Sequence, residues 1–393
     1  MLNLRSIWFP LLSLATLALV GCGERAVEWS GHVVEEDGVV RIENPVEPLA
    51  TPGTIVPNLL WSSTGPVDGD IWETPRQVHV GDDVIFLADR QAGKIHRLST
   101  DGALLPSFGE PGEGPGQYGR LIDAIPEPHG LFVVDAGNGR VEVLGPQGGV
   151  RESILLDQFV FSAVPLGPDT IAVFGAVGLE ERWQRITADG GRDPWSFPTL
   201  QESSEAKPPP SRPVGWGDRP VQMELRVPRL WVYSPTGELE RVIHIPLPPE
   251  VASEAELGQM AQQVADVLAG RGVSAQFIQE QVDQMKERLR VKSRFRDACF
   301  DEGAGLIAIL EQNPEDFGAG PATLHLLSSQ GVYLAALPFQ EAWADFDLKD
   351  GILYALARDP LTDLVTLQVY GLDIPASLME RGRGLAVPGT LGP

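Results

Sequence analysis

Apolar and polar residues alternate in short runs along most of the chain, and glycine-containing turns separate these runs. Five of the turns share one form, since each closes on a glycine between two strand-like segments. Such a turn between alternating segments predicts a β-hairpin. The five turns are STDG (99–102), GPQG (145–148), TADG (187–190), SPTG (234–237) and SSQG (328–331).

The turns recur at a nearly constant distance along the chain. Their closing glycines follow one another after 46, 42, 47 and 94 residues, and the last interval is twice 47. Before several of the turns, another apolar run ends in an acidic residue, at Asp89, Asp135, Glu311 and Asp359. A unit of about 40 to 47 residues with three or four strands is typical of a propeller blade. We therefore predict an all-β fold, a six-bladed β-propeller over residues 28–373.

The sixth unit stops near Gly371 without an outer strand. Another part of the chain must supply that strand, because closure of the ring removes exposed sheet edges. Residues 28–45 (EWSGHVVEEDGVVRIENP) are rich in β-forming residues and otherwise unassigned, so we expect them to close the ring. The C-terminal segment 374–393 is rich in Gly and Pro and is expected to be a flexible tail.

The doubled interval contains a predicted helical pair at about residues 250–293. Ser253 and Glu256 form a capping box, and apolar residues then recur at helical spacing in two successive segments. This pair is either a cap on the propeller or a lid or partner-binding arm. The stretch 194–228 is rich in proline, and its sequence does not show where the inner strands of the fourth blade lie.

The stretch GEGPGQY (112–118) raises the alternative of a nucleotide-binding loop. A dinucleotide fingerprint needs a third glycine at position 117 and a helix after it, but Gln117 stands there and two prolines follow. The stretch, together with VDAGNGRVEVLGPQG (134–148), resembles the linker and strand sequences of NHL-repeat propellers. The resemblance implies an NHL- or TolB-like six-bladed β-propeller, in which Asp135 bonds to free turn amides and Arg140 reaches acidic groups. It says little about activity, because the family ranges from binding scaffolds to lyases.

The N-terminus predicts export. Residues 7–20 form an apolar run of 14, which is shorter than a bilayer span of about 20 and has the flanks of a secretory signal. LVGC (19–22) resembles the bacterial lipobox, in which the cysteine is lipidated and becomes the mature N-terminus. We expect a signal peptide at 1–21, a lipid on Cys22 and a linker at 22–27. With Gly23 after the cysteine, the family pattern implies the outer membrane. The alternative is an ordinary signal peptide with an incidental cysteine.

The net charge of the chain limits the classes of partner that it can bind. The chain has a net charge of −24, and removal of residues 1–21 makes it −25 because only Arg5 is lost. Such a field repels phosphate backbones, so we exclude nucleic acid and expect the lipid to provide the membrane contact. If Cys22 is lipidated, Cys299 has no disulfide partner, and we interpret it as a buried small hydrophobe.

The sequence contains no local catalytic or metal-binding motif. The six histidines lack zinc spacing, no G-x-S-x-G motif occurs, and residues 345–351 depart from a calcium loop. One register pattern remains: Arg76, Arg120 and Arg296 stand 13, 15 and 15 residues before Asp89, Asp135 and Glu311.

These arginines are predicted to enter the innermost strands near one mouth of the central channel. Trp343 and Asp345 occupy neighbouring positions in the last blade. We predict that the three arginines bind an anionic group there and that Trp343 and Asp345 belong to the same binding site. The alternative is that the arginines form salt bridges between blades, with Asp123, Asp297 and Asp345 as their partners.

We therefore predict a lipid-anchored, extracytoplasmic scaffold that binds a protein or a small anionic ligand and needs no cofactor. The alternative is a metal-dependent hydrolase or lactonase that resembles the gluconolactonase and strictosidine-synthase-like propellers. That class would need Glu, Asn and Asp ligands for a divalent cation on the propeller axis.

Overall fold

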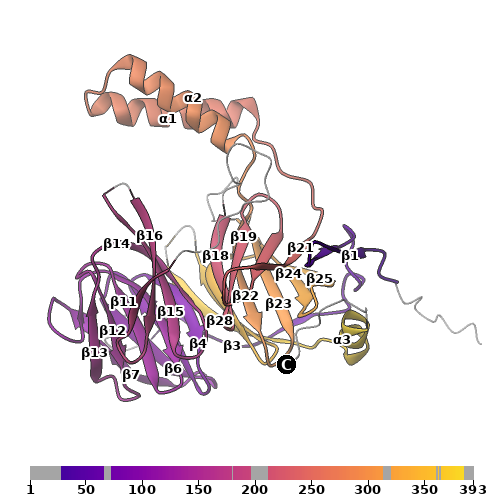
Figure 1. The fold of residues 1–393 in the computed structure, drawn as a ribbon, viewed down its shortest axis with the longest axis horizontal. Helices are drawn as coiled ribbons and strands as arrows, with labels where there is room; N and C mark the ends of the chain where they lie inside the picture. Colours follow the sequence, from indigo (N-terminus) through magenta and orange to yellow (C-terminus); the bar gives the residue numbers. More distant parts are fainter. Residues whose placement is uncertain are drawn as a thin grey trace, which may run out of the picture.

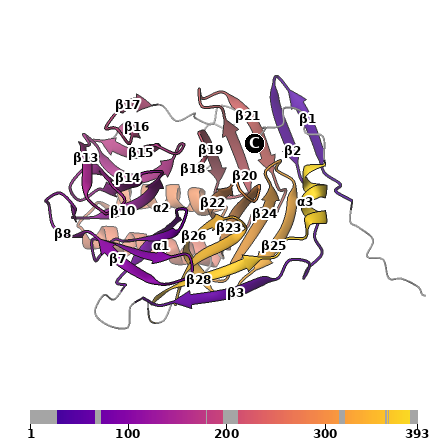
Figure 2. The same cartoon turned by 90° about the horizontal axis from the view of Figure 1, so that it is seen from below.

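The glycine turns form the hairpins that the sequence predicts. In the computed structural model, the five closing glycines have positive φ, a conformation that costs glycine little. These angles are 91°, 81°, 89°, 93° and 86° at Gly102, Gly148, Gly190, Gly237 and Gly331. Each turn joins the third and fourth strands of a blade, and the blades surround a central axis (Figures 1 and 2). The predicted six-bladed propeller is confirmed. The structure describes residues 28–65, 72–178, 180–195, 211–312, 320–359, 362 and 364–384.

The blades follow one another along the chain. Blade one contains β4 (Pro75–Val80), β5 (Val84–Asp89), β6 (Lys94–Ser99) and β7 (Leu104–Phe108). The short strands β8 (Glu110–Pro111) and β9 (Gln117–Tyr118) lie in the linker to blade two. Blade two contains β10 (Leu121–Glu127), β11 (Gly130–Asp135), β12 (Arg140–Leu144) and β13 (Val150–Leu155). Blade three contains β14 (Phe159–Pro165), β15 (Thr170–Val177), β16 (Glu180–Thr187) and β17 (Arg192–Trp195).

The second half of the ring has the same strand order. Blade four contains β18 (Ser211–Trp216), β19 (Arg219–Glu224), β20 (Arg229–Tyr233) and β21 (Leu239–His244). Blade five contains β22 (Phe295–Asp301), β23 (Leu306–Gln312), β24 (Ala322–Ser328) and β25 (Tyr333–Pro338). Blade six contains β26 (Ala342–Lys349), β27 (Ile352–Arg358) and β28 (Val365–Leu372), with β3 (Pro57–Ser63) as its fourth strand.

The closing strand is β3, so the prediction that residues 28–45 close the ring is wrong. β3 runs antiparallel to β28, with Leu367 opposite Ser63 and Leu372 opposite Pro57. Its sequence, PNLLWSS, lacks the alternation that identifies a half-buried strand, because the adjacent Leu59 and Leu60 are 50% and 49% exposed.

Residues 28–45 extend blade four instead. β1 (His32–Glu36) and β2 (Val39–Glu43) form a hairpin, and β2 pairs with β21 in parallel. Val40 and Ile42 are buried in the core between blades four and five. Asn44 fixes the end of β2, since its side chain donates to Gly331 O at 2.9 Å and accepts from Tyr333 N at 2.8 Å.

The structure also differs from the expected flexible tail. Ala376–Arg383 form α3, which lies against β24 and β25 of blade five. Leu378 is completely buried in the core, and Ser328 Oγ donates to the carbonyl oxygen of Gly382 at 3.1 Å. This apolar contact orders a segment whose composition suggests a coil.

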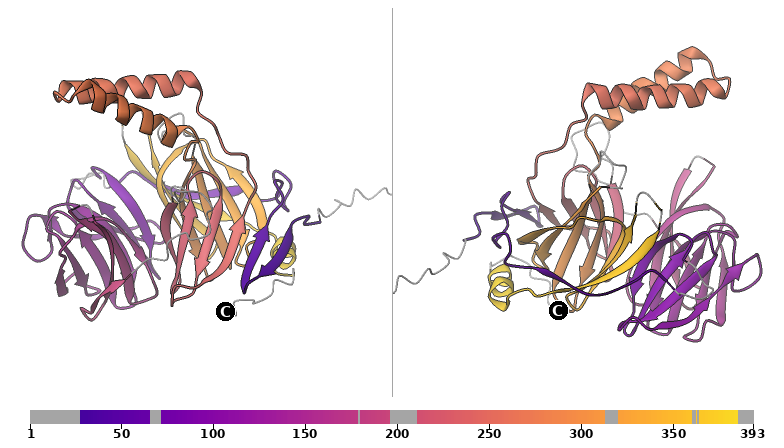
Figure 3. Two further views of the ribbon diagram at one scale, coloured as in Figure 1. Left: turned by 45° about the horizontal axis from the view of Figure 1, so that its top comes forward. Right: turned by 180° about the vertical axis from the view of Figure 1, so that it is seen from behind.

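The predicted helical pair is present as α1 (Glu254–Gly270) and α2 (Ala275–Leu289). Ser253 and Glu256 form the predicted capping box. The two helices pack on each other and stand away from the blades (Figures 1 and 3). Their base is an antiparallel bridge between Val251 and Val291. In the described part of the chain, no helix is long and apolar enough to cross a membrane.

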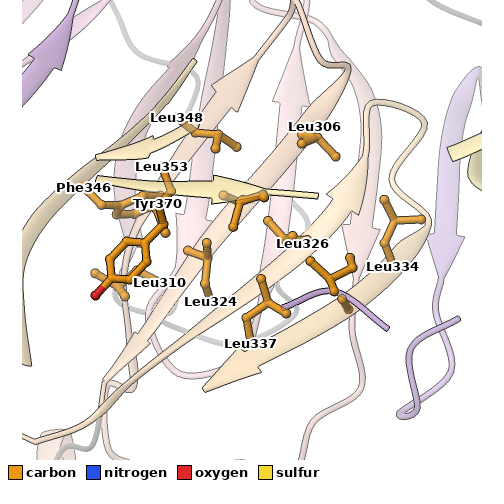
Figure 4. Packing of buried hydrophobic residues seen from close by; sticks show 14 of the residues in the cluster. Leu306, Leu310, Leu324, Leu326, Leu334, Leu337, Phe346, Leu348, Leu353 and Tyr370 are labelled. Carbon is orange, nitrogen blue, oxygen red and sulfur yellow. The ribbon is translucent and has the colours of Figure 1, made fainter. Parts of the chain in front are cut away.

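Apolar side chains fill the space between neighbouring blades. One cluster joins blades five and six, and Figure 4 shows its leucines with Phe346 and Tyr370. Shared clusters also join blades four and five, two and three, six and one, and one and two. Between blades three and four, the described residues form two separate small clusters, one on each sheet. This interface therefore has the weakest apolar connection in the described structure.

The GEGPGQY stretch is a linker held by blade two. Asp135, completely buried, accepts from the backbone amides of Arg120 at 3.0 Å and Gly137 at 3.1 Å. Arg140 donates to the carbonyl oxygens of Gly114 at 2.6 Å and Gln117 at 2.7 Å. The residues that resemble the NHL pattern therefore form a network that fixes the chain between blades one and two.

Candidate functional site

The innermost strands, which surround the axis, are irregular near their starts. In five of them the pairing register shifts by one residue, so one side chain is left without a partner residue on the second strand. Such a bulge bends the strand and redirects the side chains beside it. The skipped residues are Arg76, Ile122, Phe161, Arg296 and Ala344.

The positions directly after the bulges are equivalent in all five blades, and most are polar. β18 pairs with β19 without a register shift, and Arg212, opposite Met223, takes the equivalent position there. The six residues are Gln77, Asp123, Ser162, Arg212, Asp297 and Asp345.

Side chains from this layer connect neighbouring blades across the innermost strands. Asp123 lies 2.9 Å from His79 Nε2, and Arg212 forms an ion pair with Asp297 at 2.8 Å. Asp345 accepts from the Val78 backbone amide at 2.8 Å. The three acids that could have paired with the mouth arginines therefore have other partners.

The environment shifts the pKa values of Asp345 and of two groups that lie two residues beyond this layer on their strands, His79 and Asp347. Burial opposes a charge on His79, but the nearby carboxylates, Asp123 first, outweigh it and raise the pKa of His79 to about 9. The imidazole is therefore protonated near neutral pH. Burial and the Asp297 charge raise the pKa of Asp345 well above its usual value, and burial also raises the pKa of Asp347.

Cys299 lies two residues beyond Asp297 on the same innermost strand and is not a simple apolar residue. Its Sγ donates to Asp347 Oδ1 at 2.9 Å. Burial and the Asp347 carboxylate raise the pKa of the Cys299 thiol well above its ordinary value. The thiolate is the nucleophilic form of cysteine, and the raised pKa keeps Cys299 as the thiol. Cys299 therefore serves as a hydrogen-bond donor between blades five and six.

The structure brings Arg76 and Arg296 together and adds Arg212. Burial and the charges of Arg212 and Arg76 all lower the pKa of Arg296. Arg296 donates to Gln312 Oε1 at 2.5 Å, and Gln312 donates to the carbonyl oxygen of Trp343. Arg76 is exposed, and among the described residues it has no acidic partner.

Arg120 occupies a different position from Arg76 and Arg296. Leu121, rather than Arg120, is the residue paired with Asp135, so the bulged residue of blade two is Ile122. The guanidinium of Arg120 lies over the ring of Phe159, 5.4 Å from its centroid.

The count from the acidic residues misaligned the blades because their turns differ in length. Four residues separate Asp301 from Leu306 in blade five, whereas two separate Glu127 from Gly130 in blade two. Arg212 was missed because the sequence did not reveal Glu224, the acid that ends the second strand of blade four and pairs with the residue before Arg212.

The two residues predicted from blade six are both buried. Trp343 has no exposed surface and packs between Phe339 and Phe346 in the core, so it presents no ring face to a ligand. Asp345 is 5% exposed and lies in the layer described above.

A divalent cation on the axis would need several converging ligands. In the described ranges, no three His, Cys, Asp or Glu side chains are grouped so that they could hold a metal ion. The layer residues engage each other and the backbone instead. The arrangement of these side chains therefore does not favour the hydrolase alternative.

Comparisons with known proteins agree with the fold. No protein-family model matches the chain, and no curated protein matches it. A solved structure of a DUF4221 family member from Bacteroides vulgatus is similar, with a TM-score of 0.50 and 9% identity over 87% of this chain and 98% of that one. A protein of Bacteroides fragilis described as exported gives a TM-score of 0.52 and 9% identity over 85% and 99% of the two chains. At such low identity the likeness shows the fold alone, and the class is that of six-bladed β-propeller proteins.

Proposed function

We propose that this protein is a lipid-anchored, extracytoplasmic binding scaffold whose channel mouth recognises an anionic group of a small molecule or protein. The observation that carries the proposal concerns the ion-pair partners of Arg76 and Arg296, the two arginines at the channel mouth. Arg76 has no acidic partner among the described residues, and Asp297, which lies next to Arg296 in sequence, pairs with Arg212. A planar guanidinium suits a carboxylate or phosphate, and two of them near each other attract a shared anion.

The alternative role of the arginines is to brace neighbouring blades. That role needs Asp123, Asp297 or Asp345 as partners, and these acids contact His79, Arg212 and the Val78 amide. Burial is the main cause of the lowered pKa of Arg296, and the charges of Arg212 and Arg76 lower it further, while Asp297 and Asp345 act in the opposite direction. A bound anion would add negative charge beside these guanidinium groups.

We expect carboxylates or phosphates to raise the melting temperature of the wild type, and we expect Arg76→Gln to reduce that rise by at least half. Binding to the native state stabilises it in proportion to RT ln(1 + [L]/Kd). Differential scanning fluorimetry with citrate and inorganic phosphate measures the effect. Without added anion, Arg76→Gln should change stability by less than about 0.5 kcal/mol, because Arg76 is exposed.

Arg296→Gln should reduce the anion effect as well, and Arg192→Gln is the matched control. Arg192 lies on the outermost strand β17 and donates to the carbonyl oxygen of Leu155 at 2.7 Å. An unchanged melting temperature of the wild type at all anion concentrations would refute the anion site. Equal losses in all three variants would indicate a general charge effect.

The proposed extracytoplasmic, lipid-anchored location is supported by LVGC after the apolar N-terminal run, and by the similar B. fragilis protein described as exported. Residues 1–27 lie outside the described residues. We expect wild type to fractionate with membranes and Cys22→Ser to appear in the soluble extracytoplasmic fraction. Membrane association that is equal in both proteins would contradict lipidation of Cys22.

A further inference from the structure

Blade three carries a line of aromatic side chains that crosses all four of its strands. We define the aromatic stripe as Phe159, Phe161, Phe174, Trp183 and Trp195. Their successive ring centroids are 5.4, 5.6, 4.9 and 6.1 Å apart. Cross-strand pairing sets this line, because Phe174 is opposite Trp183, and Trp183 is opposite Trp195. The stripe therefore runs from the axis to the rim of the propeller.

The inner end of the stripe is open to solvent. Phe159 is 52% exposed and Phe161, the bulge residue of β14, is 47% exposed. Phe174, Trp183 and Trp195 are half-buried. Contiguous exposed apolar surface on a soluble protein indicates an interaction site. The stripe also borders blade four, where the described residues form no shared apolar cluster.

A positive charge lies at each end of the stripe. The Arg120 guanidinium is 5.4 Å from the Phe159 centroid, and that of Arg185 is 5.3 Å from the Trp195 centroid. Within the described residues, neither guanidinium has an ion-pair partner, although the chain has a net charge of −24. Stacking on an aromatic face leaves the edges of a guanidinium free to donate to a carboxylate.

We infer that the aromatic stripe binds an extended peptide segment of a partner protein, with aromatic or aliphatic side chains flanked by acidic ones. Charge complementarity selects this occupant, because its acidic residues would meet Arg120 and Arg185 and its apolar side chains would cover the exposed rings of Phe159 and Phe161. Four neighbouring strands span about 14 Å, which is the length of about four extended residues. Aromatic residues and arginine are the residue types most enriched at energetically important interface positions.

The helical pair is the rival occupant. α1 and α2 lie on the same side of the ring as the β15–β16 hairpin, and in the view from below they are seen behind the innermost strands (Figures 1 and 2). On these helices Val267 is 57% exposed and Phe277 is 45% exposed. Because the pair carries its own exposed apolar surface, the experiment must distinguish a peptide from the protein's own helices.

The test is peptide display against the full chain in detergent, followed by fluorescence anisotropy with the enriched peptides. We expect enriched sequences to combine aromatic with acidic residues. Phe161→Ser should weaken binding about tenfold or more, since truncation of an aromatic anchor has effects of this size. Arg185→Gln should weaken binding and reduce its salt dependence. Leu104→Ser is the matched control, because Leu104 is 49% exposed on β7 of another blade and its loss should leave affinity unchanged.

Four results would overturn the inference. The first is the absence of enriched peptides, and the second is enriched peptides that bind Phe161→Ser as tightly as wild type. The third is binding of polygalacturonate, an anionic polysaccharide, that depends on Phe161 while no peptide does. The fourth is hydrogen exchange that is slow in α2 of the free wild type and fast in Phe161→Ser, which would assign the stripe to the helical pair. If Phe161→Ser fails to fold, Arg185→Gln still decides the question. Because the variants do not touch Arg76 or Arg296, failure here leaves the channel-mouth proposal standing.

Discussion

Deletion of β3, residues 57–63, is expected to abolish the single cooperative unfolding transition of the propeller. β3 covers the outer edge of β28, and it is the strand that connects the N-terminal part of the chain to the last blade. Its removal leaves the edge of β28 unpaired and breaks the connection by which the segment before blade one closes blade six. The expected loss is comparable to the whole net stability of a domain, about 5–15 kcal/mol.

Urea unfolding followed by tryptophan fluorescence measures this effect. The matched control is deletion of residues 32–43, which removes the β1–β2 hairpin from the outer edge of blade four. That deletion should lower the unfolding midpoint, because it removes the buried Val40 and Ile42, but should preserve one transition with a similar m-value. The reverse outcome, in which only the second deletion destroys cooperativity, would mean that the ring is closed at blade four.

Asp135→Ala is expected to lower the free energy of unfolding by about 3–5 kcal/mol, the usual cost of removing one member of a buried charged network. The carboxylate is completely buried and accepts from four backbone amides, which belong to Gly119, Arg120, Gly137 and Asn138. Alanine would leave these donors without their acceptor.

The same network extends to side chains. Asn138 Nδ2 donates to Asp135 Oδ2 at 2.6 Å, and Arg140 Nε lies 3.8 Å from the same oxygen. Arg140 is buried and its Nε also lies 3.3 Å from Glu142, so loss of Asp135 removes one of its two carboxylate partners.

Equilibrium urea unfolding compares Asp135→Ala with Asp83→Ala, a change at an exposed acid in a turn of blade one. We expect Asp83→Ala to unfold close to wild type. Asp135→Asn should cost less than Asp135→Ala, because an amide oxygen still accepts from the turn amides. A midpoint for Asp135→Ala within error of Asp83→Ala would show that the linker does not depend on this carboxylate.

Local sequence patterns determined most of the blade structure. The turn glycines at 102, 148, 190, 237 and 331 set the hairpins, because a tight turn with positive φ is a local requirement that glycine meets. The capping box at Ser253 and the apolar spacing after it likewise identified α1 and α2 from residues within one or two helical turns. Where a few neighbouring residues decide a conformation, the sequence is sufficient to predict it.

Tertiary structure decided which distant segments pair. β3 and β2 are both short β-rich segments before blade one, and only the shape of the available edges assigns β3 to β28 and β2 to β21. The more regular alternation of β2 suggested the wrong partner. α3 depends in the same way on a hydrophobic surface of blade five that is far away in the sequence.

The candidate site shows the same division. The sequence identified Arg76 and Arg296 as equivalent, but it also included Arg120, since turn length shifts the register by an amount that no local pattern reveals. The pairing of Arg212 with Asp297 and of His79 with Asp123 joins residues 85 and 44 positions apart, on innermost strands of neighbouring blades. The residue types along the chain show which charged groups are present, whereas ring closure decides which of them meet at the axis and which guanidinium groups have no acidic partner among the described residues.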